Sequence, residues 1–515
     1  MTEHKHIGKI VGALMAAAVA FCLIVTLFAD RFVAVSGSSA TTMEYESTLF
    51  DTSEIMTVNI IMDEDQWQEL LDNAISEEYY ACDVEINGEM ISNVGIRTKG
   101  NTSLSSIAND PDTDRYSFKI KFDKYVDGQT CMGLDKLVLN NNFADATNRK
   151  EALVYDMFQY LGADASLYHY AKISVNGEYW GTYLALEAVE DSFKLRNYGV
   201  SDGKLYKPET MGMGNDKQEE GSNPMDRPER PQGDFDQADM DEKFKDPQGG
   251  HDDFGGFGNR NGGADLNYVD DDADSYSTIW DGADGKVTDS DKERVITAIK
   301  NINEGTDLTA YLDIDNILKY MAVHEFVVNL DSLSGNMAHN YYLYENDGQL
   351  NIIPWDYNLS FGGMTNGGMG GGPGRNSTES SGATSMINDP IDTPFDGTDF
   401  FDALLENEEY LAQYHEYLRQ LAEEYVQGGR LQEVWERLDA QTDELIETDP
   451  TAFYTAAEYE EAKETLWTVL QLRAESVLGQ LDGTIPSTDD GQQNAQDTLI
   501  DGSAIDLSVM GEFNH

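Results

Sequence analysis

The sequence predicts an α+β protein with two lobes, a strand-rich N-terminal lobe and a helical C-terminal lobe, preceded by an N-terminal transmembrane helix. Three observations carry this prediction. Residues 10–28 contain no charged side chain, residues 80–122 alternate apolar and polar side chains as half-buried strands do, and residues 289–480 repeat apolar residues at helical spacing. A chain of 515 residues is long enough for each lobe to bury a core of its own.

The uncharged run at residues 10–28 predicts a membrane anchor. At about 1.5 Å of rise per residue, a helix of this length is about long enough to cross the hydrocarbon core of a bilayer. Lys5 and Lys9 precede the run, and positive residues stay on the cytoplasmic side, so a single-pass protein with an extracytoplasmic C-terminal domain is expected. A cleaved signal peptide, with a secreted or spore-coat product, is the alternative. Asp30 and Arg31 stand where small residues would favour cleavage, so we favour the anchor.

The charge of the chain limits its partners. The sequence has 95 acidic and 34 basic residues, a formal net charge of -61, which argues against nucleic acid as a partner because phosphate binding needs a basic surface. The excess of carboxylates suits a divalent cation or a basic partner, or is only a solvated surface. The three cysteines, Cys22, Cys82 and Cys131, indicate neither a zinc site nor a disulfide framework, and we expect Cys82 and Cys131 to be free and buried.

Composition and periodicity divide the chain into six segments. The first half contains a strand and a capped helix near 57–74, hairpins through 122, a helix at 145–161 and a hairpin at 171–189. The second half contains helices near 289–303, 314–328, 399–427, 430–447 and 456–480. The expected segments are an anchor or signal (1–34), a stalk (35–50), an N-lobe (51–210), a disordered Gly/Asp/Pro-rich insertion (211–265), a helical C-lobe (266–482) and a disordered tail (483–515).

The order of these elements is that of a bilobal phosphotransferase. Such a site needs a lysine on a strand of the first lobe, a carboxylate that aligns the acceptor hydroxyl, and an amide with a second carboxylate for magnesium. Lys119 and Lys121 share one face of a predicted strand, and either could reach phosphate, although two solvated lysines fit the pattern as well. Asp331 follows an apolar helix, where it is either catalytic or a loop cap.

A predicted hairpin at 341–354 suggests where the metal ligands lie. Asn336 has the spacing from Asp331 that protein kinases use, but Asn340 directly precedes the hairpin and the second strand of the hairpin leads to Asp356, so we favour Asn340 and keep Asn336 as the second candidate. Two protein oxygens, completed by water and phosphate, form a shell that magnesium accepts. The alternative is that Asp356 only caps a turn. The Gly-rich loop 362–382 is either a mobile loop over the site or a surface linker.

Several segments resemble the CotH family, the spore-coat atypical protein kinases, over about residues 55–365. They are GIRTKGNTS (95–103), SFKIKF (117–122), FADATNRKEAL (143–153), VNGEYWGTYLALEAVED (175–191), LYKPE (205–209), and NYYLY followed by IIPWDYNLSFGG. The segments are long and collinear. The resemblance implies a protein-kinase-like fold and an extracytoplasmic enzyme that uses ATP with magnesium, or manganese, to phosphorylate serine or threonine of surface or coat proteins, including itself.

The resemblance also implies residue roles. Asp331 would be the catalytic aspartate, Asp356 and Asn340 would hold magnesium, and Lys119 or Lys121 would contact phosphate. The remaining expected ATP-binding residues are Arg97, Lys99, Asn101, Arg149 and Glu187, the last offering backbone groups to the adenine. Asn358 stands where the family commonly has a second aspartate, which weakens the negative charge at the metal.

Two other functions remain open on the sequence. The chain could be a catalytically silent adhesin or coat-assembly scaffold, because kinase-like folds often lose activity and a fold does not fix a function. It could also keep ATP but transfer a nucleotide or ligate an amino acid.

Overall fold

Seven strands of the N-terminal half close into a barrel in the computed structural model, which describes residues 41–210, 262–334, 338–364, 382–395 and 397–511. The strands are β1 (Met56–Ile61), β2 (Tyr80–Ile86), β3 (Glu89–Lys99), β4 (Ser117–Lys121), β5 (Lys136–Asn140), β6 (Tyr168–Val175) and β7 (Glu178–Glu187). Their order around the barrel is β1-β2-β3-β4-β5-β7-β6. The parallel pairing of β1 with β6 closes it, and the other neighbours are antiparallel.

The barrel wall serves two cores because successive side chains of a strand point to opposite faces. On β5, Leu137 and Leu139 are buried in the barrel interior, whereas Val138 between them belongs to the core of the helical part. On β7, Tyr183 faces the interior and Leu184 faces the helices in the same way. This shared wall fixes the barrel against the rest of the molecule.

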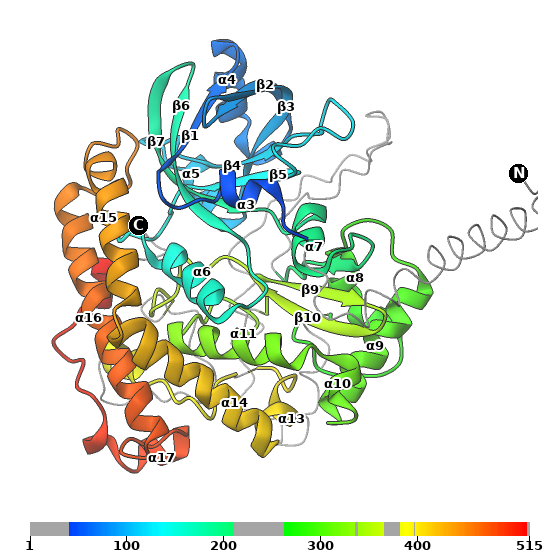
Figure 1. The fold of residues 1–515 in the computed structure, drawn as a ribbon, viewed down its shortest axis with the longest axis vertical. Helices are drawn as coiled ribbons and strands as arrows, with labels where there is room; N and C mark the ends of the chain where they lie inside the picture. The colour runs from blue at the N-terminus through cyan, green and yellow to red at the C-terminus, as the bar shows by residue number, and fades with distance from the viewer. Residues whose placement is uncertain (1–40, 211–261, 335–337, 365–381, 396, 512–515) are drawn as a thin grey trace, which may run out of the picture.

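The rest of the chain forms a helical part around a small sheet. The α-helices of this part that precede β9 in the chain are α6 (Lys150–Leu161), α7 (Asp191–Tyr198), α8 (Ser277–Asp281), α9 (Asp289–Asn303), α10 (Leu308–Tyr311) and α11 (Ile314–Val327). The sheet has the order β10-β9-β8, with β8 (Lys204–Tyr206), β9 (Tyr341–Asn346) and β10 (Gln349–Pro354). Helix α6 and the β9–β10 hairpin lie between the barrel and α11 (Figure 1).

The C-terminal helices brace this arrangement from one side (Figure 1). They are α12 (Gly382–Ile387), α13 (Asp402–Leu405), α14 (Glu408–Arg419), the π-helix Gln420–Gln427, α15 (Arg430–Glu447), α16 (Ala456–Leu481) and α17 (Asp489–Gln493). Arg473 of α16 is fully buried and donates to the Glu325 carboxylate at 2.8 Å and to the carbonyl of Phe326 at 3.2 Å. Through these contacts α16 holds the end of α11, just before the segment that carries Asp331.

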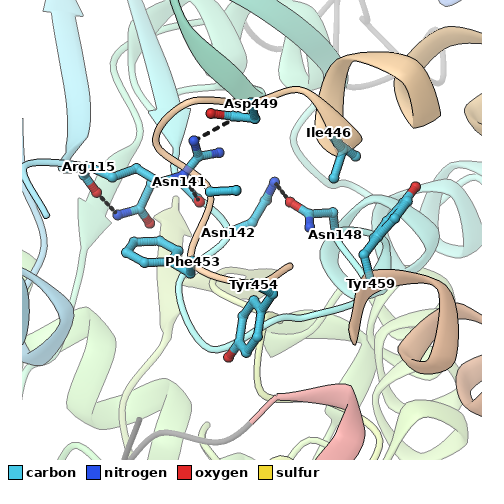
Figure 2. Close-up of a pocket in the computed structure, with 10 residues that line it drawn as sticks. Arg115, Asn141, Asn142, Asn148, Ile446, Asp449, Phe453, Tyr454 and Tyr459 are labelled. Carbon is cyan, nitrogen blue, oxygen red and sulfur yellow. Dashed lines mark hydrogen bonds and ion pairs between the residues drawn. The ribbon is translucent and has the colours of Figure 1, made fainter. Parts of the chain in front are cut away.

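A second brace joins the barrel to the loop between α15 and α16. Arg115 pairs with Asp449 at 2.8 Å, and the Asn141 amide donates to the Arg115 carbonyl at 2.5 Å (Figure 2). The cavity beside them has a volume of about 10 Å³. That is room for about one water molecule, so these residues mainly contact one another.

The expected bilobal kinase-like fold with a transmembrane helix is wrong. The seven strands close into a barrel, which overturns the predicted bilobal kinase-like fold. The sequence shows the alternation within each strand, but it does not show the β1–β6 pairing that closes the sheet. The single-pass membrane localisation is also corrected, since none of the helices in the described residues is both long and apolar enough to cross a membrane. The expected span itself, residues 10–28, lies outside the described residues, as does Cys22.

Several local expectations can be compared directly with the observed elements. The helices expected at 289–303 and 314–328 are α9 and α11, and the Asp145 carboxylate accepts from the backbone N–H groups of Arg149 and Lys150 at the start of α6. Cys82 and Cys131 are free and buried, as expected. The helix expected at 399–427 is divided into α13, α14 and the π-helix. Within the expected tail, the residues up to 511 include α17 and two short 3-10 helices, with Leu507 and Met510 buried.

Arg473→Met should destabilise the whole molecule. The variant leaves the Glu325 carboxylate buried without its partner, which typically costs about 3–5 kcal/mol of unfolding free energy. Urea unfolding at neutral pH measures the change. Arg419→Met is the matched control, because Arg419 pairs with Glu423 and Asp482 at the surface and such pairs contribute about 0–1 kcal/mol. Equal losses in both variants would contradict the brace assigned to Arg473.

Candidate active site

A cleft with a volume of about 500 Å³ lies between the barrel and the small sheet. Arg97 of β3, Lys119 of β4 and Lys136 of β5 line it from the barrel side. Lys207, which follows β8, and Tyr342 of β9 line the opposite wall. The volume falls in the range of about 300–1,000 Å³ that small-molecule sites occupy.

Five cations line this cleft in a chain of net charge -61: Arg97, Lys119, Lys124, Lys136 and Lys207. Arg97 and Lys119 are directly opposite each other in the register of β3 and β4. Like charges at opposed positions destabilise a sheet, so this placement indicates a site for an anion. Neighbouring carboxylates balance part of the charge: Glu77 lies 2.9 Å from Arg97, Glu190 2.6 Å from Lys136, and Glu209 2.6 Å from Lys207.

The β9–β10 hairpin contributes Tyr342 to the cleft lining, and Asn340 and Asp356 stand just outside its two strands in the chain. Tyr341 pairs with Pro354, so the two residues that flank the hairpin leave from the same end of the ladder. Both have a left-handed backbone, with φ of 57° at Asn340 and 62° at Asp356. Non-glycine residues rarely adopt this conformation, and it concentrates at functional sites. The local backbone therefore aims two oxygen-bearing side chains at one place.

Asp331 is held beside Asn340 by both of its carboxylate oxygens. His339 Nε2 lies 2.6 Å from Oδ1, and the Asn340 amide nitrogen donates to Oδ2 at 3.0 Å and to the Asp331 carbonyl at 2.9 Å. The carboxylate keeps some exposure, with 14% of the side-chain surface accessible. Because Asn340 uses its amide nitrogen here, its oxygen Oδ1 is the atom that a metal would take.

A buried chain of polar groups lies on the other side of Asp356. The Lys99 ammonium donates to Asn140 Oδ1 at 2.8 Å, and Asn140 Nδ2 donates to Glu151 Oε2 at 2.9 Å. Glu151 is on the first turn of α6, and its second oxygen, Oε1, is buried without a hydrogen-bond partner among the described residues. A buried carboxylate oxygen without a hydrogen-bond partner indicates a place for a cation or a proton.

The carboxylates beside these groups affect one another's ionisation. Burial raises the pKa of Glu151 to about 8, and the charge of Asp356 adds to the effect. Burial also raises the pKa of Asp356, with the Lys99 ammonium opposing the rise and the Asp331 carboxylate adding to it. Asp331 and Asp356 therefore share one electrostatic environment, and a cation placed between them would relieve their repulsion.

Aromatic rings connect the buried polar groups to the open cleft. Tyr342, which lines the cleft, packs edge-to-face on Trp355 with ring centroids 5.4 Å apart. The Lys207 ammonium lies 5.9 Å from the centre of the Tyr342 ring, and the Lys99 ammonium 5.6 Å from that of Trp355. These ring contacts connect Lys207, at the wall of the cleft, with the buried Lys99.

The described residues contain no group of three or more His, Cys, Asp or Glu side chains arranged to hold a metal ion. A magnesium ion does not need such a group, because it commonly binds one or two protein carboxylates and takes phosphate and water oxygens for its other positions. Asp356, Asn340 Oδ1 and the unpartnered Glu151 Oε1 are the oxygen donors that fit an ion bound together with a phosphate.

The structure brings together only some of the residues singled out by sequence. Lys119 and Arg97 line the cleft, whereas Lys99 is not among the lining residues and donates to Asn140. Lys121 is outside the cleft lining and lies 3.7 Å from Asp123. Asn101 precedes α5 (Thr102–Ala108), away from the cleft lining. Asn336 falls outside the described residues.

Two expected ATP-binding residues make buried contacts within the scaffold. Arg149 is fully buried and donates to Asp439 at 2.6 Å and Asp443 at 2.8 Å, so it ties α6 to α15. The Glu187 carboxylate is buried against Arg196 at 2.6 Å, and its backbone N–H donates to the Leu167 carbonyl. The Asn358 amide, in turn, donates to the Phe143 carbonyl at 2.9 Å.

Four residues of the site were missed by sequence reasoning. Glu151, Asn140, His339 and Lys207 lie in or next to the segments that carry the family resemblance, but no role was assigned to them. Glu151 could have been noticed as an acidic residue among the apolar positions of a predicted buried helix. Asn140 could not, because only the packing of β5 on α6 brings it between Lys99 and Glu151.

Glu151→Gln should stabilise the protein, and more so at high pH. A carboxyl whose folded pKa is raised contributes stability below its unfolded pKa and loses it as pH rises through the folded value, here between 4.5 and about 8. The glutamine stays neutral and keeps an oxygen for Asn140. The variant should therefore melt at a higher temperature than the parent, and this difference should be larger at pH 8 than at pH 5 by at least about 2 °C. Such a shift corresponds to a free energy of unfolding on the order of 1 kcal/mol.

Thermal unfolding in the absence of added nucleotide and metal measures this difference. Glu433→Gln, at an exposed position of α15, is the control, and its difference from the parent should not change with pH. A pH-independent difference for Glu151→Gln would mean that this carboxylate does not carry the buried charge assigned to it.

The comparisons with known proteins identify the family of the chain. No curated protein matches the chain. The model of the family described as CotH kinase protein matches residues 96–477, a span that includes β4, α6, the cleft residues from Arg97 onward and the β9–β10 hairpin. This match covers well over half of the 515 residues, and the chain therefore belongs to the CotH family.

Proposed function

We propose that this protein transfers phosphate from ATP to serine or threonine hydroxyls of protein substrates, itself included. The observation that carries the proposal is the hydrogen bond from Asn340 to the Asp331 carboxylate, next to a hairpin whose Tyr342 lines a cleft with five cations. Membership of a family described as kinases supports the reaction class. Surface or spore-coat proteins are the proposed substrates, by the same resemblance.

In this proposal the cleft cations bind the polyphosphate. Arg97, Lys119 and Lys207 would exchange their present carboxylate neighbours for phosphate oxygens, and Lys99 would approach from its position beside Asn140. Asp356 and Asn340 Oδ1 would hold magnesium, or manganese in its place, with Glu151 as a further carboxylate beside them. A bound divalent ion neutralises charge on the transferring phosphoryl group.

Asp331 is the proposed catalytic residue. The contacts of His339 and Asn340 hold its carboxylate in one orientation, while the accessible part of the side chain is available to an acceptor hydroxyl. A carboxylate in this place can align the hydroxyl and accept its hydrogen bond as the bond to phosphorus forms. Phosphoryl transfer depends mainly on such positioning and on neutralisation of charge, which are the two things that these side chains supply.

Asp356→Asn should abolish phosphoryl transfer without unfolding the protein. Loss of a preorganised charge at the transferring group commonly costs about 10²–10³ in rate. Transfer of labelled phosphate from ATP to the chain itself or to a serine-rich protein is the measurement. Asp347→Asn, at the exposed turn of the same hairpin, is the matched control and should keep the parental rate. Equal labelling by parent and Asp356→Asn would refute the assignment of Asp356.

Lys119 and Lys121 offer a matched pair for the phosphate contact. Lys119→Ala should raise the KM for ATP by about 10-fold or more, because a hydrogen bond to a charged group contributes about 1.5–3 kcal/mol. Lys121→Ala, two residues along the same strand but outside the cleft lining, should change it less than about twofold, since it removes only a surface ion pair. Initial rates over a series of ATP concentrations measure both. A larger rise in the KM for ATP in Lys121→Ala than in Lys119→Ala would contradict phosphate binding in the cleft.

Thermal unfolding with ATP and magnesium separates this proposal from a catalytically silent scaffold. A protein that binds ATP gains stability through ligand linkage, by about 2.7 kcal/mol at a ligand concentration of 100 times Kd. A scaffold without an ATP site would show no shift. Mass analysis of the modified product distinguishes phosphate from a transferred nucleotide or amino acid.

A further inference from the structure

We propose that His324 is a positioning residue that sets the segment carrying Asp331 against the segment carrying Asp356. His324 lies on α11 and is 2% exposed. One ring nitrogen forms hydrogen bonds with the segment that contains Asp331, and the other forms a hydrogen bond with the segment that contains Asp356. This inference rests on the proposed function, because it concerns the positions of the proposed catalytic and metal-binding residues. One of its tests measures magnesium-dependent thermal stability and does not require catalysis.

The Nε2 side of the ring holds the segment that contains Asp331. His324 Nε2 lies 2.7 Å from Ser334 Oγ and 3.1 Å from Ser332 Oγ. Both serine hydroxyls also donate to the carbonyl of Asn329, at 2.9 Å from Ser332 and 3.1 Å from Ser334. These bonds fold residues 329–334 into a tight loop around the imidazole, with Asp331 on its outer side.

The Nδ1 side of the ring holds the segment that contains Asp356. His324 Nδ1 lies 3.1 Å from the hydroxyl of Tyr357, the residue that follows Asp356. Tyr357 is fully buried, so its ring cannot move without moving its backbone. One side chain thus connects the two segments on which the proposed chemistry depends.

The hydrogen bonds suit one tautomer of His324. When both serine hydroxyls donate to the Asn329 carbonyl, Nε2 carries the proton and donates to the serines. Nδ1 is then the acceptor for the Tyr357 hydroxyl. Burial lowers the pKa of His324 to about 3, which keeps the ring neutral and this arrangement intact at physiological pH.

Stacked aromatic rings fix the plane of the imidazole. Tyr320 and Phe395 each stack on it with centroids 5.4 Å away, at interplanar angles of 22° and 21°. Ser332 is fully buried and Ser334 3% exposed, so a substrate cannot reach these hydroxyls and a nucleophilic role is excluded. The cluster can therefore act only through the positions of its neighbours.

His324→Phe and Tyr357→Phe test the proposal in the full-length protein. The first keeps an aromatic ring in the stack and removes both bonds, and the second removes only the bond toward Asp356. Because a small misplacement of reacting groups can cost about 100-fold, His324→Phe should lower kcat by about 10- to 100-fold, a larger factor than the rise in the KM for ATP. Tyr357→Phe should lower kcat by a smaller factor. The double variant should be no slower than His324→Phe, because both changes cut the same connection.

The second readout is the part of the ATP-induced rise in melting temperature that requires magnesium. It should shrink in both single variants, because Asp356 is no longer held where the ion binds. Tyr206→Phe is the control: the Tyr206 hydroxyl is buried in β8 and makes no hydrogen bond to the described residues, so neither readout should change.

The possible outcomes separate this inference from the proposed function. Parental kcat and a parental magnesium-dependent shift in both variants would overturn the role of His324, as would additive losses in the double variant. If His324→Phe does not fold, Tyr357→Phe alone decides. A parent chain that gives the magnesium-dependent shift but no phosphoryl transfer refutes the proposed function, and the shift in the variants then still decides the inference. A parent chain with neither property overturns both.

Discussion

The register of one hairpin is the constraint on which the rest of the site depends. Because Tyr341 pairs with Pro354, Asn340 and Asp356 leave the ladder at the same end, and both adopt a left-handed backbone there. A slip of one residue would turn every side chain of a strand to the opposite face. Leu343, Ile352 and Ile353 are buried in the helical core, so such a slip would disrupt their packing. Packing energy distant from the site thus determines where its oxygen ligands point.

The barrel and the helical part make complementary contributions to the site. The barrel supplies cations on the regular spacing of β3, β4 and β5, while the helical part supplies the carboxylates and amides. Helix α6 links the two, since Glu151 faces the barrel residue Asn140 and the neighbouring Arg149 is anchored to α15. Most cations of the cleft thus come from the barrel, whereas Asp331 and Asp356 come from the helical part.

Sequence periodicity was sufficient to predict individual helices and strands but not the closure of the strands into a barrel. The hairpin around Asn346-Asp347-Gly348 and helices α9, α11 and α15 follow from local patterns of turn residues and apolar spacing. The parallel pairing of Met56 with Ala171 does not, because it joins residues far apart in the chain and no local signal encodes it. A protein-kinase-like lobe was therefore expected where a closed barrel exists.

The same distinction applies to the site residues. Asp331, Asp356 and Asn340 could be selected because they stand beside recognisable elements. Glu151 and Asn140 could not, since their importance arises from a contact between a helix and a barrel strand. Arg149 and Glu187 were assigned to ATP for the converse reason: a charged residue in a matching segment gives no sign of the buried ion pair that engages it.

Crystals of the protein soaked with a non-hydrolysable ATP analogue and Mn²⁺ would test the central claim most directly, because the anomalous signal of manganese locates the ion. The account predicts a peak at about 2.0–2.5 Å from an Asp356 carboxylate oxygen, the usual range for hard cations and oxygen ligands, with phosphate oxygens and Asn340 completing the shell. A nucleotide bound outside the cleft, or an ion that does not touch Asp356, would contradict it.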